Sequence, residues 1–383
     1  MTPPSRPPAE PSPLTLAPRR NRSGVRGWSR CPTTSLRSRS GARAPQRKVG
    51  SAVPLSVLFI GGTGIISSEG VRRALAVGHE VTVLNRGRTS IRPLPDGVRT
   101  LTADVRDPGS VREALGDERF DAVIEFAAFT PEHVQQDIDL FAGRTGQYVF
   151  ISSASAYQKP PARLPVTEST PLRNPYWSYS RDKIACEDLL VGEYRRTGFP
   201  VTIVRPSHTY DRTALPVDGG WTVIDRMRRG LEVVVPGDGT SLWTITHSRD
   251  VAVGLVGLLG ASAAIGEAFH ITGDEAPTWD RIHHDLAAAA GTEARIVHIA
   301  SDAIAAADPE LGAGIVGDKA HSMVFDNAKI RSLVPAFSPS TRFSDGAREI
   351  VEWYDADPAR RTVDERTDRL FDALIETYRP RAL

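Results

Sequence analysis

Short apolar runs that alternate with helix-like segments are the feature that most restricts how this chain can fold. Uninterrupted apolar runs are typical of strands buried on both faces, and such strands occur in parallel sheets covered by helices. Helical patterns fill the intervals, at Ser68–Val77, at Val111–Leu115 and from about Ser180 to Thr197. The sequence therefore predicts an α/β fold with a doubly wound parallel sheet, whose strands are Val57–Ile60, Val81–Leu84, Ala122–Phe126, Tyr148–Ser152 and Val201–Val204.

The first predicted strand runs directly into a glycine turn, and a helix follows. The turn reads Gly61-Gly62-Thr63-Gly64-Ile65-Ile66-Ser67. Glycines let the backbone approach a pyrophosphate, while the helix N-terminus presents free N–H groups and the positive end of its dipole. Ser67 stands where a third glycine normally permits close packing of helix on strand. In this strand–turn–helix context the motif predicts a dinucleotide-binding site, and a plain structural turn is the alternative.

The end of the second predicted strand, at Asn85, is where dinucleotide-binding proteins distinguish NAD from NADP. An acidic residue there binds the ribose 2′-OH of NAD, whereas a cation accommodates the 2′-phosphate of NADP. Asn85 replaces the acid and is followed by Arg86 and Arg88, which favours NADP over NAD. The alternative is that both arginines are solvated loop residues. After a third predicted strand, Asp104 and Val105 are expected beside the adenine, whose amino group can donate to the carboxylate.

A serine, a tyrosine and a lysine form the strongest chemical constellation in the sequence. Ser153 ends a predicted strand, and Tyr179 and Lys183 lie four residues apart on one face of a later predicted helix. A lysine ammonium close to a phenol lowers the pKa of the tyrosine from about 10 toward the working pH, so the tyrosine can act as an acid or base. Lys183 is also one of only five lysines in the chain, which favours a functional role over a chance surface pair.

Taken in order, these motifs resemble those of short-chain dehydrogenase/reductases of the extended or atypical type, the NAD-dependent epimerase/dehydratase family. The matching stretches are Gly61–Ser67, Asp104–Asp107, Ile151–Tyr157, Tyr179–Lys183, Val204–Pro206, Gly237–Thr240 and Thr246–Ala252. The resemblance implies a Rossmann-type domain with a smaller C-terminal α/β substrate lobe, and Ser153, Tyr179 and Lys183 as the catalytic triad. The expected cofactor-binding residues are Gly61, Thr63, Gly64, Ile65, Ile66, Asn85, Arg86, Asp104, Val105, Ala127, Tyr179, Lys183 and Pro206.

The chain is expected to divide into three parts. Residues 1–53 are rich in proline, arginine and serine without apolar periodicity, so we expect a disordered extension, either a targeting segment or a stretch upstream of the true start. Residues 54–210 are expected to form the dinucleotide-binding domain, completed by parts of 245–275. Residues 211–383, where the pattern becomes irregular and glycine-rich, are expected to form mainly the substrate lobe.

Two departures from the family pattern bear on the substrate. Nucleotide-sugar epimerases of the family typically have an asparagine at the position of His208 and an arginine at that of Trp243, and the loss of that arginine removes a charge-assisted contact to a diphosphate. Ser155, in the motif that follows the strand ending at Ser153, is a third candidate substrate contact. We therefore expect a small hydroxylated or carbonyl substrate rather than a diphosphate-linked sugar. Trp243 either stacks on a substrate ring or fills the core, and His208 either binds substrate or is structural.

Charge and cysteine content limit the remaining alternatives. Residues 1–53 carry eleven basic residues and one acid, so the rest of the chain has a net charge of −9 and no specific nucleic-acid partner is expected. Two cysteines, Cys31 and Cys186, give no disulfide framework or zinc motif, so no metal site is predicted. No apolar run is long enough to span a membrane, and a cytoplasmic location is expected.

The predicted function is an NAD(P)-dependent oxidoreductase or epimerase that acts on a hydroxyl or carbonyl carbon. The alternatives are a nucleotide-sugar epimerase and a non-catalytic dinucleotide-sensing or RNA-associated member of the family. Such non-catalytic members tend to lose the tyrosine or the lysine, and both are present here. The oligomeric state stays open, with a homodimer as one alternative.

Overall fold

A computed structural model of the protein describes residues 53–88 and 91–379. The predicted N-terminal extension lies outside these residues except for Val53. Among the described residues, no helix combines the length and the apolar character that crossing a membrane requires.

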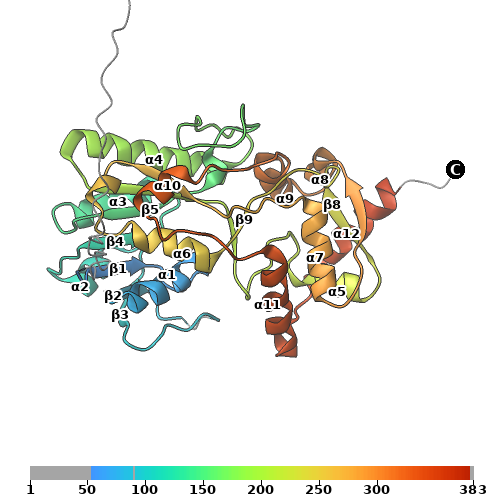
Figure 1. The fold of residues 1–383 in the computed structure, drawn as a ribbon, viewed down its shortest axis with the longest axis horizontal. Coiled ribbons are helices and arrows are strands. Elements are labelled where there is room, and N and C mark those ends of the chain that lie inside the picture. Colours follow the sequence, from blue (N-terminus) through green and yellow to red (C-terminus); the bar gives the residue numbers. More distant parts are fainter. Residues whose placement is uncertain (1–52, 89–90, 380–383) are drawn as a thin grey trace, which may run out of the picture. The chain divides into compact units, whose positions relative to one another are not determined.

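Seven parallel strands form the central sheet, in the order β10-β6-β5-β4-β1-β2-β3 (Figure 1). The strands are β1 (Ser56–Ile60), β2 (Glu80–Asn85), β3 (Arg99–Thr102), β4 (Ala122–Glu125), β5 (Tyr148–Ile151), β6 (Val201–Pro206) and β10 (Ala268–Ile271). The predicted fold class is confirmed, because this is a doubly wound parallel sheet of the Rossmann type covered by helices.

Alternate residues of each strand pack on opposite layers of helices, which explains why the strand sequences are apolar throughout. In β1, Val57 and Phe59 pack in one cluster with α1 and α6, whereas Leu58 and Ile60 pack in another with α2, α3 and α4. The helices of the two layers are α1 (Ile65–Ala76), α6 (Ser248–Gly257) and α10 (Ala328–Leu333) on one face, and α2 (Pro108–Leu115), α3 (Pro131–Phe141) and α4 (Ser178–Thr197) on the other.

The order of the strands reverses at β1, which pairs with β2 on one side and with β4 on the other. Ligands of open α/β sheets bind at such a point, outside the carboxyl ends of the strands. The residues that follow β1 and β4 are Gly61 and Phe126, and the Phe126 N–H donates to the Ile60 carbonyl at 3.1 Å. The topology thus places the glycine turn at the position where a ligand is expected.

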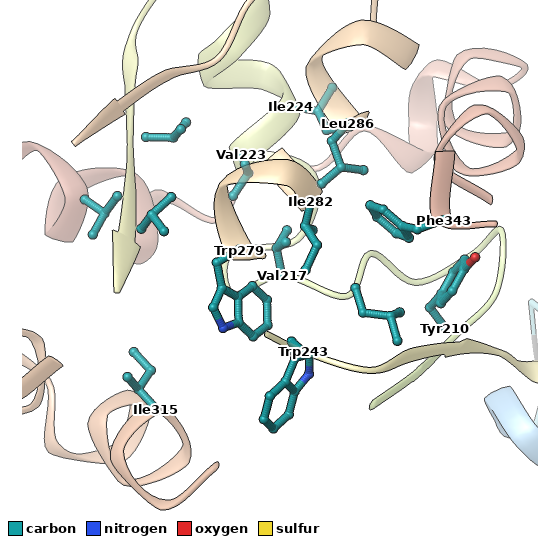
Figure 2. Packing of buried hydrophobic residues seen from close by; sticks show 14 of the residues in the cluster. Tyr210, Val217, Val223, Ile224, Trp243, Trp279, Ile282, Leu286, Ile315 and Phe343 are labelled. Carbon is teal, nitrogen blue, oxygen red and sulfur yellow. The ribbon is translucent and has the colours of Figure 1, made fainter. Parts of the chain in front are cut away.

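The sheet and its two helix layers form one part of the molecule, and a second hydrophobic cluster, separate from the two that pack on the sheet, organises the remaining elements. Trp243 and Trp279 stack within this second cluster, with ring centroids 5.7 Å apart, and Tyr210 and Phe343 lie next to each other in it, with ring centroids 5.4 Å apart (Figure 2). Its strands form two short parallel pairs, β7 (His208–Tyr210) with β9 (Ile245–His247), and β8 (Glu232–Pro236) with β11 (Arg295–Ile299). The other elements are α5 (Trp221–Arg228), α7 (Trp279–Ala289), α8 (Ser301–Ala307), α9 (Pro309–Gly314), α11 (Phe343–Asp355), α12 (Glu365–Tyr378), the 3₁₀ turns η1 (Ala154–Ala156), η2 (Ser262–Ala264) and η4 (Pro358–Arg360), and one π-helical turn, η3 (Ile315–Lys319).

The expected three-part division stays a prediction, and the chain passes more than once between the sheet and the second cluster. Strand β10 and helix α6 belong to the sheet. Ile330 and Phe337 also pack on the sheet. Conversely, Tyr157 and Val166 pack in the second cluster. The segment 154–177, which connects β5 to α4, therefore contributes side chains to the second cluster.

Candidate active site

The glycine turn after β1 is held in a conformation that requires small residues. Gly61 has a φ of +85°, and a Cβ added to Gly62 would lie 2.7 Å from the Val83 side chain. The Ser67 hydroxyl donates to the Gly61 carbonyl at 2.6 Å and accepts from the Gly64 N–H at 2.8 Å. The serine that replaces the third glycine therefore ties the turn to the first turn of α1, where Ile65 and Ile66 begin the helix.

A pocket of about 350 Å³ lies against this turn at the carboxyl ends of the strands. It is lined by seven of the residues predicted to bind the cofactor and by Arg88, which the sequence already places near the 2′-phosphate of NADP. Leu84, Arg106 and Phe129 also line it and were not predicted. The predicted residues in the lining are Gly61, Thr63, Asn85, Arg86, Asp104, Val105 and Ala127.

The polar groups of this pocket are positioned by short local hydrogen bonds. The Asn85 side-chain oxygen accepts from the Gly87 N–H at 2.8 Å, and an Asp104 oxygen accepts from the Arg106 N–H at 3.0 Å. Arg86 and Arg88 are exposed. Because the lining holds three arginines against Asp104, the pocket has a positive charge excess that suits a phosphate.

Tyr179 and Lys183 lie one turn apart on α4, as predicted, beside the end of β5. The Lys183 ammonium donates to the Ala128 and Ile151 carbonyls, both at 2.8 Å, and lies 5.9 Å from the centre of the Tyr179 ring. Phe129 lines the pocket beside the glycine turn, and its ring is 6.5 Å from that of Tyr179 and 4.9 Å from the Lys183 ammonium. Phe129 therefore links this pocket to Tyr179 and Lys183.

Three serine hydroxyls form a chain beside Tyr179. The hydroxyls of Ser153 and Ser155 lie 2.9 Å apart, and the Ser180 hydroxyl donates to that of Ser155 at 2.8 Å. A hydrogen bond also links Ser153 to Tyr179. Ser155 is buried, whereas Ser153 is only partly buried. Ser153 is therefore the more accessible of these two hydroxyls, although both residues line the same cavity.

The pKa of Tyr179 in the structure differs from the one expected from the sequence. Burial raises the pKa of Tyr179 to about 12, although its hydrogen bond with Ser153 acts in the opposite direction. The lowered pKa expected from the neighbouring lysine is not found, because the Lys183 ammonium is directed at two backbone carbonyls. Burial lowers the pKa of Lys183 to about 8, while the acidic side chains of Cys186, Glu125 and Glu187 act in the opposite direction.

A smaller cavity, of about 190 Å³, adjoins Tyr179. Its lining includes Ser153, Ser155, Pro206, His208 and Trp243, which unites two of the three catalytic candidates, Ser153 and Tyr179, with all three predicted substrate contacts. Burial lowers the pKa of His208 to about 4, so this side chain is neutral at pH 7. Trp243 is 3% exposed and stacks on Trp279, so it fills the core and also forms a wall of the cavity.

Several residues of this cavity were not predicted from the sequence. The Trp177 ring lies 4.8 Å from that of Tyr179, tilted by 43°, and Lys159 and Asp318 form an ion pair of 3.0 Å in the lining. The scarcity of lysine, which drew attention to Lys183, applies equally to Lys159. No comparable signal marks Asp318, because it is one of 46 acidic residues and is brought to the site by the fold.

The residues of the pocket beside the glycine turn fit a nicotinamide dinucleotide. The positive φ of Gly61 and the lack of space at Gly62 give the close backbone approach that a pyrophosphate requires. The N–H groups of the first turn of α1 supply donors. Arg86 and Arg88 line this pocket, and the Lys183 ammonium donates to the carbonyl of Ala128, the residue after the lining residue Ala127.

Two curated relatives align with this chain over about two thirds of their own length. The chain is 29% identical to 2′-dehydrokanamycin reductase from Streptomyces kanamyceticus over 241 residues, which is 61% of this chain and 67% of that protein. It is 28% identical to the chloroplast stem-loop binding protein of 41 kDa b from Arabidopsis thaliana over 255 residues, 63% of this chain and 65% of that protein.

A solved structure shares the fold. The dTDP-glucose 4,6-dehydratase from Bacillus anthracis, in complex with NAD, superposes with a TM-score of 0.64 at 17% identity, covering 79% of this chain and 97% of that one. At this identity the likeness concerns the fold alone. The model of the NAD dependent epimerase/dehydratase family matches residues 57–272, more than half of the chain. The protein therefore belongs to the NAD-dependent epimerase/dehydratase family.

Proposed function

We propose that the protein is an NAD(P)-dependent oxidoreductase or epimerase that acts on a hydroxyl or carbonyl carbon of a small substrate. One observation carries the proposal: Tyr179 and Ser153 line a cavity, and the Lys183 ammonium lies one helical turn away, beside the dinucleotide pocket. The triad thus lies where a substrate and a dinucleotide could meet.

Each member of the triad has a distinct role in this proposal. A bound nicotinamide dinucleotide supplies the two-electron donor or acceptor. The Ser153 hydroxyl holds the substrate oxygen, and the Tyr179 hydroxyl gives that oxygen a proton or takes one from it. Lys183, protonated below about pH 8, binds ribose hydroxyls and favours the phenolate form of Tyr179 when it turns from its carbonyl partners.

The size and lining of the cavity favour a small substrate over a nucleotide sugar. Its volume, about 190 Å³, is below the range of pockets that enclose drug-sized ligands, about 300–1,000 Å³. Trp243 occupies the place of the arginine that would bind a diphosphate. The retention of Tyr179 and Lys183 supports an enzyme over an RNA-associated relative, as does the net negative charge of residues 54–383.

Two measurements test the proposal. Purified protein is incubated with NAD(H) or NADP(H) and four probes, neutral myo-inositol, cationic glucosamine, anionic glucuronate and the diphosphate-linked UDP-glucose, and turnover is followed at 340 nm and by NMR of the products. Mass analysis of nucleotide released on denaturation then separates an epimerase, which retains its dinucleotide, from a reductase, which exchanges it. Failure to bind either dinucleotide contradicts the proposal.

We expect the protein to prefer NADP, and Arg86→Ala to weaken NADP binding by about 1–3 kcal/mol with little effect on NAD, the scale of a hydrogen bond to a charged group. Calorimetry with both dinucleotides measures the difference. Arg88→Ala shows which of the two arginines contributes more. Arg73→Ala, on the exposed side of α1, is the control outside the pocket. An equal loss for NAD and NADP would mean that Arg86 does not read the 2′-phosphate.

We also expect the affinity for NAD to be steady from pH 7 to about 8 and to fall at higher pH. Lys183 has a pKa lowered to about 8, so its ammonium, which is the form that donates to ribose, is present below that value and lost above it. The fall approaches tenfold per pH unit where one proton is required. Fluorescence titration measures it, and Lys183→Met should give weaker binding with a flat profile. A wild-type affinity that is unchanged to pH 10 would contradict this role.

A further inference from the structure

The substrate cavity contains a carboxylate that the proposed chemistry does not use. Asp318 lies on the π-helical turn η3 and lines the same cavity as Tyr179, Ser153 and His208. Its side chain is 13% exposed. Its negative charge acts on two side chains of the cavity, since it raises the pKa of Tyr179 and opposes the fall in the pKa of His208. Asp318 is therefore close to the reacting end of the cavity.

A buried lysine fixes this carboxylate. The side chain of Lys159 is fully buried, and its ammonium lies 3.0 Å from one oxygen of Asp318 and 5.5 Å from the centre of the Trp243 ring. A charge in such a place is costly unless it is paired, so Lys159 holds Asp318 at the wall of the cavity. Only one Asp318 oxygen is engaged at that distance, and a carboxylate accepts several hydrogen bonds.

The backbone that carries Asp318 is also held close to the catalytic helix. Asn174 donates from its amide to the Gly317 carbonyl at 2.6 Å and to the Ser155 carbonyl at 2.9 Å, so one buried side chain joins η3 to the serine network. A Cβ on Gly317 would lie 2.7 Å from the Trp177 Cβ, which shows how closely η3 packs on the residues before Tyr179. π-helical turns of this kind are frequent at functional sites.

From this geometry we propose that Asp318, positioned by Lys159, is a specificity-determining residue that accepts a hydrogen bond from a hydroxyl or ammonium group of the substrate. A carboxylate accepts from donors and repels anions, so the preferred substrate is a small neutral or cationic polyhydroxylated compound. A substrate that places a carboxylate or phosphate at this wall is rejected. The inference rests on the proposed function, because it assigns the cavity beside Tyr179 to the substrate.

The test measures binding of the four probes by calorimetry in the presence of saturating dinucleotide, in the wild-type protein and in Asp318→Asn. We expect wild-type protein to bind myo-inositol or glucosamine at least tenfold more tightly than glucuronate or UDP-glucose. Asp318→Asn should weaken binding of the favoured probe by about 10- to 100-fold, the range for a hydrogen bond to a charged group. The amide retains an oxygen acceptor but no charge, so a larger loss for glucosamine than for myo-inositol identifies an ammonium donor, whereas equal losses identify a hydroxyl donor in both probes.

Two further variants keep the test decisive. Asp225→Asn is the matched control, because Asp225 pairs with Arg229 at 2.9 Å outside this cavity, and it should leave probe binding unchanged. Asp318→Asn leaves Lys159 buried without its partner, so circular dichroism checks the fold. If the single variant is unfolded, Lys159→Met/Asp318→Asn removes both charges and should show the same loss of probe binding.

The outcomes separate this inference from the proposed function. Tighter binding of glucuronate or UDP-glucose, no binding of either favoured probe, or equal affinities in Asp318→Asn and Asp225→Asn would each overturn the role of Asp318. Turnover of an anionic probe would do so while the proposed oxidoreductase or epimerase activity stands. Absence of dinucleotide binding would instead remove the proposed function on which the inference rests.

Discussion

Tyr179→Phe should reduce turnover by about 10²- to 10⁴-fold, the range for loss of a general acid or base. The substitution removes the hydroxyl that exchanges a proton with the substrate oxygen and retains the ring. That ring packs on Trp177, with centroids 4.8 Å apart, and near Phe129 at 6.5 Å, so the shape of the site is kept. Dinucleotide affinity should therefore change little. The measurement is kcat with whichever probe the wild-type protein turns over, beside the dinucleotide dissociation constant.

Tyr176→Phe provides the matched control for this variant. Tyr176 lies three residues earlier, is 46% exposed and does not line the cavity beside Tyr179. The same loss of a hydroxyl there should leave kcat unchanged. Near-normal turnover in Tyr179→Phe would contradict the triad. A large loss of dinucleotide affinity without a change in kcat would assign Tyr179 to binding.

The sheet could be predicted from sequence because its strands are buried on both faces. In β4 and β5 every residue is buried, so the strands appear as apolar runs. Strand β3 is different: it lies at the edge of the sheet, and Arg99, Thr100 and Thr102 are exposed. It could be placed only by the motif that follows it. Local pattern thus predicts central strands well and edge strands poorly.

The pocket beside the glycine turn was also largely predictable, because its residues lie at the ends of strands. Gly61, Asn85 and Asp104 lie at or just beyond the ends of β1, β2 and β3, and the carboxyl ends of parallel strands meet at one edge of a sheet. The cavity beside Tyr179 is assembled differently. Lys159 and Trp243 come from loops and Asp318 from η3, far apart in the chain, and no periodicity relates them. Their meeting depends on how the second hydrophobic cluster packs beside the sheet.

The pKa of Tyr179 shows a second limit of sequence reasoning. A spacing of four residues correctly places Tyr179 and Lys183 on one helix face. It cannot show where the flexible lysine side chain directs its ammonium, which here donates to Ala128 and Ile151. Nor can it show how far burial raises the pKa of the phenol. Titration depends on desolvation and on partners from other elements, which only the folded structure supplies.

Glu187→Gln is expected to have the largest effect on stability, because it breaks a buried ion pair behind the triad. Glu187 on α4 and Arg205 on β6 are 2% and 7% exposed at their side chains, and the Arg205 Nε lies 2.9 Å and 3.1 Å from the two carboxylate oxygens. Glu187 also accepts from the Ser152 hydroxyl at 2.5 Å. The pair therefore joins the catalytic helix to the strand that ends at Pro206.

The cost of this substitution comes mainly from the charge that is left behind. Removal of one partner from a buried pair leaves the other charge desolvated and uncompensated, which typically costs about 3–5 kcal/mol. Urea unfolding of Glu187→Gln measures that loss, and Arg196→Gln on the same helix, where Arg196 is 72% exposed, should cost about 0–1 kcal/mol. Glu187→Leu/Arg205→Met removes both charges and should recover most of the stability, because apolar replacement of a buried pair is often neutral or better. If the double variant is as unstable as Glu187→Gln, the contribution of Glu187 lies in its contact with Ser152 rather than in the ion pair.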